Sequence, residues 1–147
     1  MYYNIGEVAK KFNLTISTLR YYDSEGLFPD LQRNNGIRKF CENEIEALRV
    51  MECLKKSGLE IKDIKKFLDL CKEGPKTYQE RKELFLKQKA QVDEEIKKLE
   101  KTKAMLEFKC WYYETALKEG SEDKIKALIP DGLPKEIKKL YLKCHQD

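Results

Sequence analysis

Apolar residues recur at helical spacing from the start of the chain. One face of a short helix is formed by Ile5, Val8, Ala9 and Phe12. Asn13 ends this helix, and Thr15 stands as the N-cap of a second helix over residues 16–24, with Leu19 and Tyr22 on its inner face. Two short helices joined by a short turn predict a helix-turn-helix motif.

A tight turn is predicted beyond this motif. Asn34-Asn35-Gly36 separates a short strand over residues 31–33 from a second strand over residues 37–40. A turn of this composition between two strands forms a small hairpin. A hairpin that follows a helix-turn-helix is typical of a winged helix.

Two further helical patterns follow, over residues 42–57 and 60–72, and Gly74-Pro75 ends the second. Good helix formers dominate the whole chain, and glycine and proline are few. We therefore predict a mainly α fold that begins with a winged helix-turn-helix domain over residues 1–74.

A long helix is predicted next, because neither glycine nor proline occurs over residues 77–118. At 1.5 Å per residue it would be about 60 Å long. Its apolar positions repeat every seven residues from Tyr78, which predicts a coiled coil with a second copy of the chain. The expected homodimer interface consists of Phe85, Val92, Ile96, Leu99, Leu106 and Tyr113.

The tail over residues 119–147 contains two short amphipathic patterns that can fold back on the long helix. Aromatic residues gather at the end of that helix, at Phe108, Trp111, Tyr112 and Tyr113. Such a cluster either lines a pocket for a hydrophobic or cationic effector or simply holds the tail in place.

Composition excludes several classes of function. The net charge of +4 does not by itself indicate nucleic acid, and the first residues lack the apolar core of a signal peptide, so we expect a cytoplasmic protein with no membrane segment. The five cysteines are widely spread, as in proteins with reduced thiols. His145 is the only histidine and no nucleotide-binding loop occurs, so we expect no enzyme, no metal site and no cofactor.

The second helix of a helix-turn-helix enters the DNA major groove. Its outward residues here are Ser17, Thr18, Arg20 and Tyr21, and the hairpin adds Arg33, Arg38 and Lys39, which can lie along an adjacent backbone. The alternative is that Arg20 pairs with Asp23 and that the hairpin cations are ordinary solvated charges.

Several blocks in order resemble the MerR family of bacterial transcriptional regulators: Ile5-Gly6-Glu7-Val8-Ala9, Ser17-Thr18-Leu19-Arg20-Tyr21-Tyr22-Asp23, Gly26-Leu27, Gly36-Ile37-Arg38-Lys39-Phe40 and Ser57-Gly58-Leu59. The resemblance implies that the residues named above contact double-stranded promoter DNA. It also implies a dimer that binds an inverted repeat and distorts the promoter for RNA polymerase when a small effector binds.

The resemblance also bears on the effector. Thr77 and Tyr78 stand where metal-sensing members have a cysteine, so metal sensing is not expected. Cys53 resembles the cysteine of the aldehyde- and electrophile-responsive subgroup, and Lys55 and Lys56 could make it reactive. The alternative is an inert core cysteine on an apolar helix face. The competing class for the whole chain is a structural coiled-coil protein without DNA activity.

Overall fold

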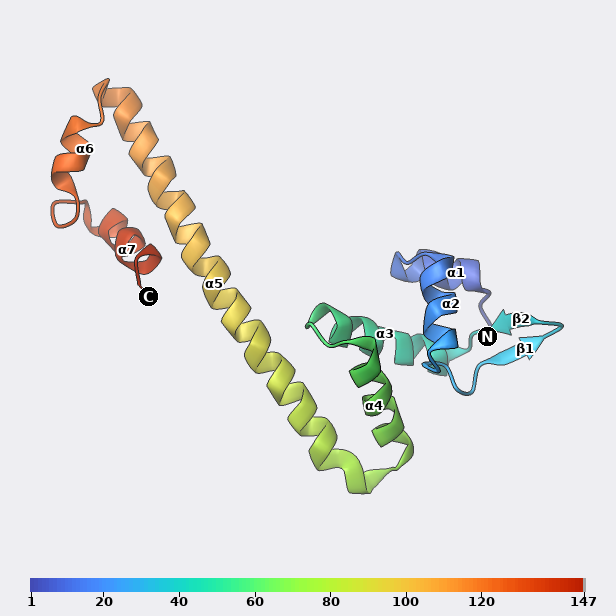
Figure 1. The fold of residues 1–147 in the computed structure, drawn as a ribbon. Helices are drawn as coiled ribbons and strands as arrows, with labels where there is room; N and C mark the ends of the chain where they lie inside the picture. The colour runs from blue at the N-terminus through green and yellow to red at the C-terminus, as the bar shows by residue number, and fades with distance from the viewer. Residues whose placement is uncertain (147) are drawn as a thin grey trace. The chain divides into compact units, whose positions relative to one another are not determined.

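The computed structural model describes residues 1–146, which form two compact units, one over residues 1–91 and one from residue 92 onward. Helices dominate both units, and the only sheet among the described residues is a two-stranded antiparallel hairpin in the first (Figure 1). The mainly α fold with an N-terminal helix-turn-helix, a small hairpin and a long helix is therefore confirmed. No described helix has the length and apolar character needed to cross a membrane.

Side-chain caps define the two helices of the helix-turn-helix. Helix α1 (Ile5–Phe12) begins at Asn4, whose side chain accepts from the Glu7 backbone N–H while the Glu7 carboxylate accepts from that of Asn4. It ends at Asn13, which adopts a left-handed conformation with φ of 53°. Helix α2 (Ile16–Ser24) begins at Thr15, whose hydroxyl accepts from the Thr18 N–H. The two predicted caps, Asn13 and Thr15, are thus observed, and the cap at Asn4 is an addition.

The wing is the hairpin of β1 (Gln32–Asn34) and β2 (Ile37–Lys39), in which Arg33 lies directly opposite Arg38. Its turn has positive φ at both central residues, 50° at Asn35 and 76° at Gly36. Asparagine and glycine tolerate this conformation best, and it matches the twist of a two-residue hairpin. The predicted hairpin is confirmed, with the first strand shifted by one residue and the second strand one residue shorter.

Helices α3 (Glu42–Lys56) and α4 (Ile61–Lys72) complete the core of the first unit. Isolated pairing between Tyr3 and Phe40 joins the N-terminus to the end of the wing. The largest fully buried side chains of this core are contributed by every helix of the domain and by the chain around the wing: Val8, Leu19, Tyr22, Leu27, Phe40, Ile45, Leu48, Met51, Leu54 and Ile64.

The long helix α5 (Tyr78–Glu119) follows a short 3₁₀ turn, η1 (Pro75–Thr77). Its first part belongs to the first unit, since the Phe85 ring meets the Phe67 ring edge-on at 5.3 Å and the Ser57 hydroxyl donates to Gln88. These contacts extend the compact unit to Gln91, past the boundary at residue 74 that the glycine-proline pair suggested.

The second unit contains the rest of α5 with α6 (Asp123–Leu128) and α7 (Lys135–Cys144). Its core consists of Phe108, Tyr112, Ile125 and Leu133, with Trp111 and Tyr141 packed against them. The tail thus folds onto the end of the long helix, as its two amphipathic patterns predicted.

Candidate nucleic-acid interface

Helix α2 has an inner face and an outer face. Leu19 and Tyr22 are buried in the core, which turns Ser17, Arg20 and Tyr21 toward solvent. Tyr21 keeps half of its surface exposed. A guanidinium, a phenol and a hydroxyl are thereby presented together on one short helix, and all three can bind base edges or phosphates.

Thr18 differs from the other predicted contacts on α2. It is half-buried, and its hydroxyl lies 2.8 Å from the Thr15 hydroxyl at the cap of the helix. A hydroxyl can donate one bond and accept others, so Thr18 still has capacity for a phosphate. Its orientation is set by the cap, which the sequence pattern alone did not indicate.

The wing arginines are held by an acidic residue of α2. The Asp23 Oδ2 atom accepts from Arg33 Nη2 at 2.5 Å and from Arg38 Nε at 2.7 Å, and the Asp23 side chain is 7% exposed. Sequence reasoning considered Asp23 only as a partner for Arg20, which has no ion pair among the described residues. Lys39, the third predicted wing contact, is half-buried and forms no ion pair within residues 1–146.

A polar network attaches α2 to α3. The Tyr22 hydroxyl donates to Glu52 Oε1 at 2.9 Å and accepts from Lys55 Nζ at 2.9 Å. Burial raises the pKa of Tyr22; the bond from Lys55 opposes this effect and the bond to Glu52 adds to it. The same bond to Tyr22 raises the pKa of the Lys55 ammonium. Helix α2 is therefore fixed to α3 by a part-buried hydrogen-bonded triad.

Cys53 lies between the two α3 residues of this triad and its side chain is exposed. The interpretation of Cys53 as a buried core cysteine is therefore wrong, because its side chain lies on the outer side of α3 while Met51 and Leu54 fill the core. Lys55, which was expected to act on the thiol, is instead bound to Tyr22. Cys71 and Cys110 are exposed as well.

The aromatic cluster predicted for an effector is mostly packed against the tail. Phe108 and Tyr112 are 3% and 6% exposed, and the Phe108 ring contacts Trp111 and Tyr141. This arrangement matches the alternative in which the cluster holds the tail in place. Of the cluster, only Tyr113 lines the open groove next to it, together with Ala116 and Leu117.

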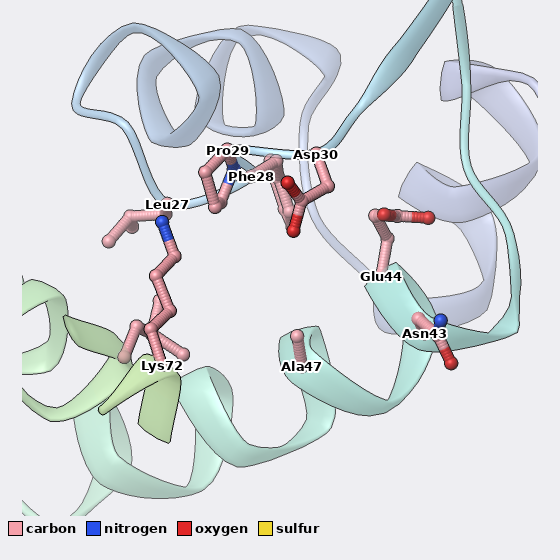
Figure 2. Close-up of a pocket in the computed structure, with 9 residues that line it drawn as sticks. Leu27, Phe28, Pro29, Asp30, Asn43, Glu44, Ala47 and Lys72 are labelled. Carbon is pink, nitrogen blue, oxygen red and sulfur yellow. The ribbon is translucent and has the colours of Figure 1, made fainter. Parts of the chain in front are cut away.

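A small pocket lies in the first unit between the segment after α2, the start of α3 and the end of α4 (Figure 2). Its volume is about 170 Å³, and its walls are apolar, with Asp30, Glu44 and Lys72 among the lining residues. None of the residues predicted for an effector lines it. Within the described residues, no cluster of histidine, cysteine and carboxylate side chains can hold a metal ion.

The predicted dimer interface on α5 is an apolar seam, and most of its side chains are exposed to solvent in a single chain. Leu99, Leu106 and Tyr113 are 69%, 61% and 55% exposed. Ile96 and Phe85 are also exposed, while Val92 is half-buried. Large apolar side chains repeating along one helix without cover mark an interaction surface.

Known protein families match the part of the chain that contains the helix-turn-helix, the wing and the first part of α5. The family model described as "MerR HTH family regulatory protein" matches residues 3–71, and the model "MerR, DNA binding" matches residues 45–107. An uncharacterized HTH-type transcriptional regulator of Haemophilus influenzae is 36% identical over 122 residues, which cover 82% of this chain and 90% of that protein.

Two further relatives extend the comparison. The HTH-type transcriptional regulator AdhR of Bacillus subtilis is 36% identical over 92 residues, covering 62% of this chain and 66% of that protein. The crystal structure of HiNmlR, a MerR family regulator described as lacking the sensor domain and bound to promoter DNA, is similar with a TM-score of 0.72 and 35% identity. The match covers 84% of this chain and 99% of that one.

Proposed function

The chain belongs to the MerR family of DNA-binding transcriptional regulators, and we propose that it acts as a homodimer that distorts promoter DNA in response to a small effector. It is a regulator and not an enzyme, as its relatives are. The family models and the relatives argue against the interpretation as a structural coiled-coil protein. Binding promoter DNA and RNA polymerase would place the protein in the bacterial cytoplasm.

The exposed face of α2 beside a basic wing is the observation that carries this proposal. Ser17, Arg20 and Tyr21 supply groups that suit the major groove. Arg33, Arg38 and Lys39 supply positive charge on a hairpin that protrudes from the helices (Figure 1). A relative with 35% identity is described as bound to promoter DNA, which supports the same use of these elements here.

The exposed seam of α5 supports the homodimer. A second copy of the chain offers the matching apolar helix, and pairing would remove the apolar surface of Leu99 and Leu106 from water. A dimer carries two copies of α2, so its DNA site is expected to be an inverted repeat.

Selection from a random pool of DNA duplexes tests the DNA proposal. The purified protein is expected to enrich an inverted repeat, and its affinity for the selected duplex should fall by about 10³-fold or more between 50 and 200 mM salt. This loss follows from the release of counterions when phosphates are neutralised. An enriched sequence without symmetry, or an affinity independent of salt, would contradict the proposal.

The effector proposal rests on the place of Cys53 in the structure. Its thiol is exposed, and its neighbours Glu52 and Lys55 hold Tyr22 of the recognition helix. Addition to a small aldehyde would form a bond between the sulfur and the carbonyl carbon, while the thiol proton moves to the carbonyl oxygen. Such an adduct on α3 would disturb the triad and thereby reposition α2 for promoter distortion.

Transcription by purified RNA polymerase from the selected promoter tests this step, with formaldehyde as the probe. The change in transcript level is expected to vanish in Cys53→Ser, while DNA binding without the probe is retained. Cys71→Ser and Cys110→Ser are matched controls because both thiols are exposed, and both variants should respond normally. A normal response of Cys53→Ser would refute thiol sensing at this position.

A further inference from the structure

We infer that Asp23 is a positioning residue that fixes the wing to the recognition helix, so that both elements meet DNA as one preorganised surface. The inference rests on the proposed DNA binding and assigns a role to a residue that does not itself contact DNA. It is carried by the geometry at the end of α2, where one carboxylate joins two elements.

The bonding geometry ties the wing to α2 at a single atom. Asp23 Oδ2 accepts from Arg33 Nη2 on β1 and from Arg38 Nε on β2, so both strands are bound to the last turn of α2. The Asp23 side chain is 7% exposed and that of Arg38 is 26% exposed, so this pair is screened less than an ordinary surface pair. The two bonds therefore hold the hairpin at one angle to the helix.

The register of the hairpin explains why a carboxylate is needed there. Arg33 and Arg38 are directly opposite each other in the ladder, so their side chains leave the same face of the hairpin. Like charges in opposing positions destabilise a strand pair. Asp23 compensates this repulsion, since one negative charge lies between two positive ones and leaves a net charge of +1 on the group.

Binding to Asp23 does not prevent the arginines from binding phosphate. A guanidinium has five N–H donors, and each arginine gives one to Asp23. The Arg33 side chain is 48% exposed and that of Arg38 is 26% exposed, so the remaining donors are accessible to a phosphate. The carboxylate thus limits the directions in which the two guanidinium groups point and leaves their charge available.

Preorganisation of the wing and the change in net charge predict opposite effects of Asp23→Asn on DNA affinity. Asp23→Asn keeps the shape of the side chain and removes one negative charge from the DNA-binding unit. Electrostatics alone would make the variant bind DNA more tightly. If Asp23 positions the wing, the variant must instead pay the entropy of ordering two free arginines on binding, and its affinity falls.

The test compares Asp23→Asn with Asp30→Asn on the DNA duplex selected by the wild-type protein. Asp30 is exposed in the same unit, forms no ion pair within the described residues, and gives the same change in charge. We expect Asp23→Asn to bind at least about tenfold more weakly than Asp30→Asn, and Asp23→Glu to recover part of the loss. Equal or tighter binding by Asp23→Asn would overturn the inference.

Amide hydrogen exchange in the free protein supplies a second readout that needs no DNA. Exchange in residues 32–39 should be faster in Asp23→Asn than in Asp30→Asn, with no difference in α3. Unchanged exchange in the wing would overturn the positioning role even where the variant folds normally. Failure of the wild-type protein to select any duplex would refute the proposed function, while the exchange experiment would still decide the role of Asp23.

Discussion

The core of the first unit and the seam of α5 differ in how their apolar side chains are covered. Ile45 and Leu48 are completely buried within one chain, whereas Leu99 and Leu106 are 69% and 61% exposed. The apolar faces of helices α1 to α4 pack against one another within the chain, whereas the apolar seam of α5 stays exposed. The comparison indicates that the core of the first unit is covered by its own chain, whereas the seam of α5 would be covered only by a partner such as the proposed second copy.

The largest effect is expected from placing charged side chains in the seam, which tests whether the seam is a dimer interface. Leu99→Asp combined with Leu106→Asp would put carboxylates into a dry interface, at a cost of several kcal/mol for each unpaired charge, roughly as for other buried ions. Analytical ultracentrifugation should then find a monomer whose first unit remains folded. Lys97→Asp, on a different side of α5 from Leu99, should leave the dimer intact. A stable dimer of the double variant would show that another surface joins the chains.

A core substitution should act on stability and leave assembly unchanged. Ile45→Ala removes a fully buried side chain and should lower the free energy of unfolding by about 2 to 5 kcal/mol, because a cavity remains. Leu86→Ala, in the same unit but 53% exposed, should change it by less than about 0.5 kcal/mol. Urea unfolding of both variants measures the contrast, and similar losses would contradict the assigned burial.

Substitution of two cations in the DNA-binding unit should weaken DNA binding in different ways. Arg20→Ala should weaken binding to the selected duplex by about 1 to 3 kcal/mol and relax sequence preference, as expected for a base contact. Lys39→Ala should weaken binding to all sequences alike and reduce the salt dependence, because it loses a phosphate contact. Binding isotherms on selected and scrambled duplexes separate the two effects. Identical behaviour of the variants would argue against Arg20 as a base-reading residue.

The smallest effect concerns the triad between α2 and α3. Tyr22→Phe removes a hydroxyl that bonds Glu52 and Lys55, and should lower the free energy of unfolding near neutral pH by about 1 kcal/mol. The folded pKa of Tyr22 lies above its ordinary value of 10.0, so the stability that it contributes is present below pH 10 and is lost as the pH rises through the folded pKa.

Lys55 adds to this loss in the same direction, because its folded pKa also lies above the ordinary value of 10.5. Wild-type protein should therefore lose more stability than Tyr22→Phe when denaturant unfolding is repeated at alkaline pH. An equal alkaline loss in both proteins would mean that the triad does not couple to folding.

Local sequence signals predicted most of the fold. Thr15 and Asn13 mark helix ends through bonds to their own neighbours, and Asn35-Gly36 supplies the positive φ angles that a short hairpin requires. Such signals depend on adjacent residues, so the sequence alone contains them. The alternation of buried and exposed positions along α2 also followed from helical spacing.

Contacts between distant residues could not be predicted in the same way. Asp23 binds Arg33 and Arg38 only because the hairpin folds back to the end of α2, and nothing in the local pattern distinguishes this partner from Arg20. The burial of Phe108 and Tyr112 depends equally on where the tail packs. Spacing identified the candidate residues, and tertiary packing determined which of them remain accessible.

The junction between α4 and α5 is stabilised by side-chain contacts of two kinds. Phe85 is 40% exposed on the seam, yet its ring also meets Phe67 of α4, and the Thr77 hydroxyl donates to the Leu70 carbonyl just before the long helix begins. The start of α5 is therefore fixed to α4 by side-chain contacts as well as by the chain itself. If the proposed second copy covers the seam, Phe85 would be shared between that interface and the packing of α4, so one side chain would belong both to assembly and to the fold of the first unit.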